Sequence, residues 1–164
     1  MAIEQVIITW IHLTSAAIWV GGSLFIGAVL APILKTMSYS LEERLQMMIR
    51  VGRRFNKIAI PSLIILIGSG IYNSYSFFNN FELLFSTSYG NLLTIKIILV
   101  IALIITYIIH VRIIRKDIEE QIMSKKMSEQ QIKKLRSKII ILGEIIVIIS
   151  VAILFMAALL NSSI

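Results

Sequence analysis

Four long apolar runs, separated by short polar segments, dominate this chain of 164 residues. The four runs cover approximately residues 5–34, 58–80, 91–114 and 139–161. Each supplies the roughly 20 apolar residues that an α-helix needs to cross the hydrocarbon core of a bilayer. With 57% of its residues hydrophobic, the chain is too apolar for a soluble globule. The pattern predicts an all-α integral membrane protein, folded as a single domain over residues 1–164 with four transmembrane helices.

The positive charges predict how this bundle is oriented. Fifteen of the sixteen Lys and Arg residues lie in segments 35–57 and 111–138, whereas the loop 82–90 and both termini contain none. Because cytoplasmic loops are enriched in Lys and Arg, we expect an up-and-down bundle with both termini outside and two basic cytoplasmic loops. We therefore assign the net charge of +7 to topology and to contact with an anionic inner leaflet, and expect no nucleic-acid partner.

The polar loops carry helix-start signals. "SLEE" at Ser40 and "SEQQ" at Ser128 each place a Glu or Gln three residues after a serine, which is typical of a capping box. We expect helices to start there and to lead into the second and fourth spans, with a kink near Pro61. The third span should continue as a helix into the second basic loop, which turns near residues 125–128.

Several classes of function are excluded by what the sequence lacks. There is no cysteine, so disulfides, iron–sulfur clusters and thiolate metal sites are ruled out. No serine-hydrolase set, zinc motif or phosphate-binding loop is present, which leaves little room for hydrolytic catalysis. The first apolar run has no positive n-region and is too long for a cleaved signal peptide, so we expect it to remain as a span.

Four ionisable residues fall inside the spans, where such groups are costly and usually face the bundle interior. His12 and Lys96 are placed by the topology in the outer parts of the first and third spans, so the two can meet. His110 and Glu144 lie near the inner ends of the third and fourth spans and form a second pair. At 1.5 Å per residue, His12 and His110 are roughly 15–20 Å apart along the membrane normal, which argues against one bis-histidine haem. A packing role remains the alternative for each of the four.

Helical spacing places further residues beside these four. His12, Ala16, Trp19 and Ser23 fall on one stripe of the first span, at offsets of 0, 4, 7 and 11. The "GSGIYN" motif of the second span provides small residues at the same outer level, followed by Tyr72. Small residues allow helices to pack closely or leave room for a ligand.

The four spans together resemble the membrane domain of the copper resistance protein D (CopD) family. The resemblance is carried in order by "IHLTSAAIWVGGSLFIGAVLAPIL", "RRFNKIAIPSLIILIGSGIYNSY", "YGNLLTIKIILVIALIITYIIHVR" and "LRSKIIILGEIIVIISVAILFMAALL". It implies a multi-pass plasma-membrane protein associated with copper uptake or tolerance. The family-like positions are His12, Trp19, Gly21, Gly22, Lys96 and Glu144. A weaker resemblance links the chain to HemJ-type protoporphyrinogen oxidases, which also have a first-helix histidine and a later lysine.

The residues themselves leave the cofactor open between a copper ion and haem b. For copper, His12, His110 and Glu144 are the candidate ligands, although copper(I) prefers sulfur and the seven methionines form no cluster. For haem, His12 would be the axial ligand, Lys96 would pair with a propionate, and Trp19 and Tyr72 would form walls. We therefore predict a copper-handling protein first and a haem-dependent redox protein or oxidase second. A small accessory subunit in a homodimer or larger membrane complex is the structural alternative.

Overall fold

The computed structural model describes residues 3–37, 39–75, 81–124 and 126–162, and all of its regular elements are helices. Their order is α1 (Ile3–Phe25), the π-helical turn η1 (Ile26–Leu30), α2 (Ala31–Thr36), α3 (Leu41–Asn73), α5 (Phe81–Ser86), α6 (Ser88–Ile113), α7 (Lys116–Met123) and α8 (Glu129–Ser162). Four continuous helical segments are long and apolar enough to cross a membrane. This confirms the predicted all-α class with four membrane-spanning helices. The second of these segments, α3, ends at Asn73, and residues 76–80 of the predicted second span lie outside the described ranges.

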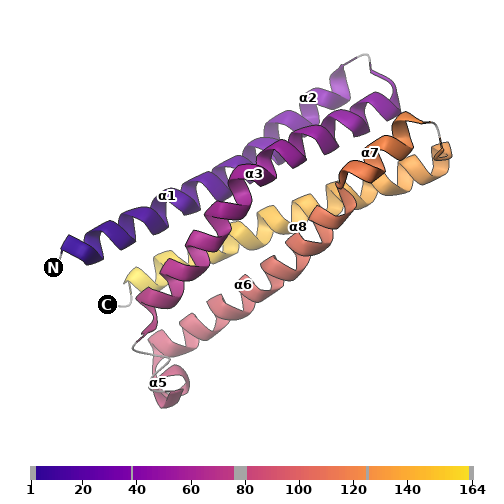
Figure 1. Cartoon of the computed structure of the whole chain (residues 1–164). Coiled ribbons are helices and arrows are strands. Elements are labelled where there is room, and N and C mark those ends of the chain that lie inside the picture. Colours follow the sequence, from indigo (N-terminus) through magenta and orange to yellow (C-terminus); the bar gives the residue numbers. More distant parts are fainter. Residues whose placement is uncertain (1–2, 38, 76–80, 125, 163–164) are drawn as a thin grey trace.

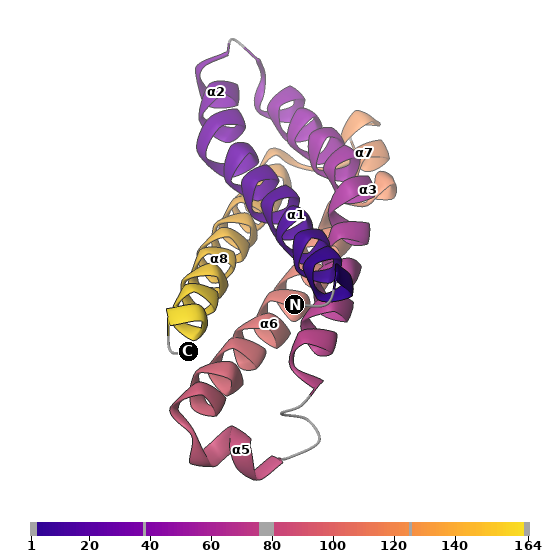
Figure 2. The same cartoon turned by 90° about the vertical axis from the view of Figure 1, so that its left-hand side faces the viewer.

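The helices run up and down as two packed pairs. α1 packs along α3, and α6 packs along α8, with α8 also contacting α1 and η1 between the pairs. Both chain ends and α5 lie at one end of the bundle, and α2 and α7 lie at the other (Figure 1; Figure 2). We call this second end the basic end, because it carries both Lys- and Arg-rich segments. The placement of the basic end in the cytoplasm stays a prediction from the charges.

The outside of the bundle is coated by large aliphatic side chains. Ile64, Ile98 and Ile148, on three different helices, are each at least 60% exposed. In the most apolar window of each spanning helix, only 17–22% of the residues are buried. Such a surface would drive aggregation in water, whereas lipid tails can cover it at no cost.

Both predicted capping boxes are present at the basic end. The Ser40 hydroxyl accepts the Glu43 N–H at 3.2 Å, and the Glu43 carboxylate accepts the Ser40 N–H at 2.7 Å. Ser128 and Gln131 exchange the same two bonds at 3.3 and 2.8 Å. These bonds satisfy N–H groups that a helix start otherwise leaves without partners, which fixes where α3 and α8 begin.

The helix of the third span is interrupted where the sequence predicted continuity. α6 ends at Ile113, and Arg115 adopts an extended backbone before α7 starts. The break lets α7 change direction and pack beside α3, so that Ile122 is 1% exposed, in a small core with Ile114 and Leu45 of α3. Burial of these aliphatic side chains outweighs the helical bonds that are lost at the break.

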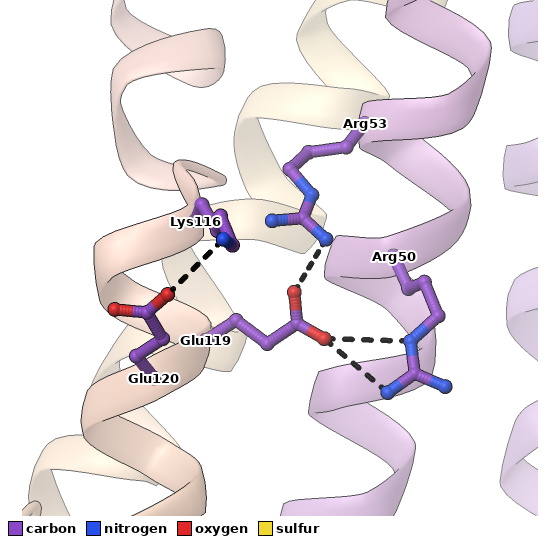
Figure 3. Close-up of polar contacts among 5 residues, drawn as sticks. All are labelled: Arg50, Arg53, Lys116, Glu119 and Glu120. Carbon is purple, nitrogen blue, oxygen red and sulfur yellow. Dashed lines mark hydrogen bonds and ion pairs between the residues drawn. The ribbon is translucent and has the colours of Figure 1, made fainter.

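A buried carboxylate fastens α7 to α3. Glu119 is 6% exposed and lies between two arginines of α3 (Figure 3). One of its oxygens is 2.5 Å from Arg53 Nη2, and the other is 3.3 Å from Arg50 Nη2. Because a buried charge is costly without partners, the two guanidinium groups are what allow Glu119 to be buried.

The spanning helices also contain two proline-associated irregularities. At the end of η1, the Ala31 N–H donates a hydrogen bond to the Ile26 carbonyl, five residues earlier. Pro32 follows directly, and since its ring has no N–H and crowds the preceding turn, a widened turn relieves the clash. The sequence analysis did not anticipate this turn. Pro61 lies inside α3, whose ribbon bends along its length as expected for a proline kink (Figure 1).

Replacing Glu119 by glutamine should loosen α7. We expect Glu119→Gln to lower the free energy of opening of α7 by about 1–2 kcal/mol, because the two arginines lose their shared counter-charge but are partly exposed. Hydrogen exchange of the α7 amides measures this. Glu120→Gln is the matched control, since Glu120 is exposed and pairs only with Lys116 on its own helix. Equal exchange in both variants would contradict the fastening role.

Candidate functional site

His12 is held by a hydrogen bond between the first and second spans. Its Nδ1 lies 2.7 Å from the hydroxyl oxygen of Ser69 on α3. The Ser69 hydroxyl also lies 2.6 Å from the Ile65 carbonyl one turn earlier. A hydroxyl carries one proton, and a carbonyl can only accept, so this proton goes to Ile65 and the Ser69 oxygen accepts from His12. This arrangement of acceptors favours the tautomer protonated at Nδ1, which keeps a lone pair on Nε2, the atom with which a histidine can bind a metal ion.

The His12 side chain lines a cavity of about 340 Å³ between the helix pairs, which we call the His12 cavity. Lys96 of α6 lines the same cavity, so the structure brings together the two residues that helix depth placed at one level. Ala16 and Trp19 continue the wall along α1, as the stripe predicted. Aliphatic side chains from α3, α6 and α8 make up most of the remainder.

A layer of aromatic side chains lies on the side of the His12 cavity that faces the basic end. Trp19 is 2% exposed, and its indole N–H donates to the Ser150 hydroxyl of α8 at 3.0 Å. Its ring meets Tyr107 edge to face, with the centroids 4.8 Å apart. The Tyr107 hydroxyl donates to the Asn56 side-chain oxygen at 2.8 Å. The pair thus joins α1, α6 and α8 to α3 through polar contacts in the middle of the bundle.

A second cavity, of about 160 Å³, lies on the other side of this layer, toward the basic end. We call it the His110 cavity. It is lined by both His110 and Glu144, the second pair predicted from helix depth, and by Tyr107 and Arg136. Buried His110 Nε2 and Arg136 Nε have no hydrogen-bond partner in the described part of the chain. Glu144 itself is exposed on α8.

The two cavities keep the candidate ligands apart. Trp19 borders the His12 cavity and Tyr107 borders the His110 cavity, so the aromatic pair separates them. His12 and His110 do not share a site, in agreement with their predicted difference in depth. Across the described residues, no three His, Cys, Asp or Glu side chains come close enough to hold a metal ion.

Tyr72 lies elsewhere than the haem interpretation required. It does not line the His12 cavity. Its hydroxyl donates to the Glu4 carboxylate at 3.1 Å, and its side chain is 48% exposed. A neighbouring bond from Gln5 to Asn73 at 3.1 Å also joins the start of α1 to the end of α3. Tyr72 therefore helps to align these helix ends and forms no wall for a ligand.

Three polar residues of the site were missed from the sequence. Ser69, Ser150 and Asn56 are the partners of His12, Trp19 and Tyr107. Ser69 and Ser150 are small polar side chains within mainly apolar stretches, and that isolation was the available signal, whereas Asn56 lies in the basic stretch "RRFNK" and gave no such signal. Which aromatic or imidazole group each one meets depends on how the helices are rotated.

The two glycines of the first span, Gly21 and Gly22, differ in their surroundings: Gly22 packs against α3, and Gly21 has free space beside it. A β-carbon added at Gly22 would overlap the Phe55 ring of α3, whereas one added at Gly21 would meet no atom within 4 Å. Phe55 lines the His110 cavity, so Gly22 brings α1 close enough to α3 to help close that cavity. Small residues permit such close approach of helices in membranes.

Four apolar helices around two mainly apolar cavities, each with ionisable side chains in its lining, define a multi-pass membrane protein that encloses ionisable groups within its bundle. The family described as "Copper resistance protein D" matches the chain over residues 49–160. The chain belongs to this family, which confirms the resemblance seen in the sequence. The match contains Lys96, His110 and Glu144, whereas His12 and Trp19 lie before its start.

Two similar proteins extend this comparison. The "Copper transport protein CutJ" of Bacillus subtilis (strain 168) is 28% identical over 112 residues, which cover 68% of this chain and 20% of that protein. An "Uncharacterized protein" of Aquifex aeolicus (strain VF5) is 37% identical over 67 residues, covering 40% of this chain and 45% of that protein. The chain thus spans about a fifth of the first relative and under half of the second. No solved structure matches it. None of these descriptions refers to haem, so the haem interpretation gains no support.

Substitutions at the glycine pair test the packing of α1 on α3. We expect Gly22→Ala to lower the free energy of unfolding by about 1–3 kcal/mol, because the Phe55 ring must shift to make room. Gly21→Ala should be neutral or stabilise by up to about 1 kcal/mol, since alanine favours helix and nothing opposes its methyl group. Reversible unfolding in mixed micelles measures both. A larger loss at Gly21 than at Gly22 would contradict this packing.

The bond between Trp19 and Ser150 should contribute measurably to stability. In a double-mutant cycle of Trp19→Phe and Ser150→Ala, we expect a coupling energy of about 0.5–1.5 kcal/mol, the range found for hydrogen bonds between membrane helices. The same unfolding assay provides the four free energies. A coupling near zero would show that the two groups do not stabilise each other.

Proposed function

We propose that this chain moves copper ions across the cell membrane and that His12 is the ligand that receives the ion from the outer side. Membership in the copper resistance family and likeness to a protein named for copper transport support copper as the cargo. The likeness covers a fifth of that relative, so the transport activity of this chain is part of the proposal. The cell membrane as its location and the cytoplasmic basic end follow from the resemblance and the positive-inside rule.

The observation that carries the proposal is the contact of His12 Nδ1 with the Ser69 hydroxyl, which itself contacts the Ile65 carbonyl. Ser69 accepts from Nδ1 because its own proton is given to the Ile65 carbonyl. The lone pair on Nε2 is therefore available without a change of protonation. Histidines that bind metals commonly have their other nitrogen held in this way, which orients the ring and raises its basicity.

The donor set of the His12 cavity suits passage of copper better than storage. One imidazole lines the cavity, and the chain offers no thiolate. Copper(I) binds most tightly to soft sulfur ligands, so a lone imidazole holds it weakly. The positive charge of Lys96 in the same cavity weakens the binding of a metal cation further. Transport requires binding that is strong enough for entry and weak enough for release.

The proposed path continues from the His12 cavity to the His110 cavity. There the imidazole of His110 and the carboxylate of Glu144 are the next available ligands. The pair of Trp19 and Tyr107 lies between the two cavities, so an ion can pass only when these rings move apart. Their hydrogen bonds to Ser150 and Asn56 then restrain the barrier in its closed state.

Copper transport by variants of His12 and Ser69 tests the proposal. We expect His12→Ala to abolish copper flux into proteoliposomes, and Ser69→Ala to lower it about 10- to 100-fold because the imidazole loses its orienting partner. Ser62→Ala is the matched control, since that serine of α3 bonds only the Ile58 carbonyl of its own helix. It should leave the flux within about twofold, as expected for a serine with no partner outside its helix.

An absorption spectrum and metal analysis of the purified protein separate the alternatives. A Soret band that disappears in His12→Ala would replace the copper proposal with a haem-dependent redox function. Unchanged copper flux in His12→Ala would remove His12 from the path. If the wild-type protein shows neither colour nor flux, an accessory role in a larger membrane complex replaces transport.

A further inference from the structure

The His110 cavity is lined by more positive charge than a copper path needs. Lys35 of α2, Arg44 of α3 and Arg136 of α8 all line it, together with His110. Glu144, exposed on α8, is the one carboxylate among the lining residues. Three cations converging from three helices create a field that favours an anion over a metal cation.

Two buried nitrogen atoms in this cavity need a partner. Arg136 Nε is an obligate N–H donor, because a guanidinium group stays charged in proteins, yet it has no acceptor among the described residues. His110 Nε2 also has no partner among the described residues, and it donates or accepts according to the tautomer of the ring. A buried donor that is left unpaired costs about 1–3 kcal/mol, so such atoms call for a missing acceptor. Arg44 is already engaged, since it donates to the Tyr39 and Met37 carbonyls.

The remaining lining is mainly apolar. Ile26 and Leu30 of η1 and Ile140 and Val147 of α8 form the sides of the cavity. The volume of about 160 Å³ is well above the roughly 10–15 Å³ that one water needs, which gives room for a group as large as a phosphate. A tetrahedral phosphate has five heavy atoms and offers acceptors in several directions.

We propose that the His110 cavity binds the phosphate of an anionic phospholipid from the cytoplasmic leaflet, with an acyl chain lying between η1 and α8. Arg136 is the principal ligand, and Lys35 and His110 complete the site. The position of the cavity at the basic end places it at the depth of the inner headgroups, where anionic lipids are attracted to Lys and Arg. This site does not rest on copper transport, and its test needs no copper.

Native mass spectrometry of the delipidated protein tests the site. The probes are phosphatidylglycerol and phosphatidylcholine with identical acyl chains, titrated into the detergent-solubilised protein. We expect one phosphatidylglycerol to bind at least about tenfold more tightly than phosphatidylcholine, because both lipids carry the phosphate but only phosphatidylcholine adds a cationic choline, which Lys35, Arg44 and Arg136 repel. Arg136→Gln should remove this preference, and Arg136→Lys should restore part of it.

Lys138→Gln is the matched control, because it removes the same charge from an exposed position of α8 that does not line the cavity. It should keep the preference for phosphatidylglycerol within about twofold. An equal loss in Lys138→Gln and Arg136→Gln would show diffuse attraction to the basic end and overturn the site. If Arg136→Gln does not fold, Lys35→Gln takes its place, with an expected loss of about fivefold from one cation.

Inorganic phosphate distinguishes a lipid from a soluble anion. We expect millimolar phosphate to leave the bound phosphatidylglycerol in place, because the free ion has no acyl chain to bury between η1 and α8. Displacement of the lipid by phosphate, or equal binding of both lipids, would overturn the lipid assignment. Weakened copper flux in His12→Ala together with unchanged lipid binding would show that the two proposals stand separately.

Discussion

The structure depends on the lack of hydrogen-bond partners in lipid. A polar side chain within the spans bonds a carbonyl of its own helix, as Ser62 does, finds a partner on a neighbouring helix or faces a cavity. His12 with Ser69, and Trp19 with Ser150, meet this need between different pairs of helices. The same constraint that holds the bundle together therefore also fixes the chemistry of its interior, because the partner of His12 determines which nitrogen is protonated.

The aromatic layer turns one bundle into two chemically different compartments. On one side, a single oriented imidazole shares a cavity with Lys96, which suits brief contact with a metal cation. On the other side, several cations and two unpartnered nitrogens suit an acidic headgroup. Trp19 and Tyr107 separate these environments, so an ion at the outer site and a lipid at the inner site meet only when the two rings move apart.

The basic end is stabilised in the way that water-soluble proteins are, by helix caps, a small aliphatic core and ion pairs. Capping boxes start α3 and α8, and a small aliphatic core buries Ile122 under α7. Glu119 can be buried there because two arginines surround it, and these arginines can also reach water. The end of the bundle is thereby stiffened close to the His110 cavity, since Ile114 belongs to this core and also lines that cavity.

The sequence by itself determined the number of spans, the starts of two helices and the absence of thiolate ligands. It also placed His12 level with Lys96 and His110 level with Glu144, because a helix rises by a fixed distance per residue. Only the tertiary structure decided that Ser69 partners His12, that Tyr72 lies outside the cavity, and that α6 ends before α7. The spanning helices are apolar on nearly all faces, so their periodicity does not show which face turns inward, and packing against neighbouring helices makes that choice.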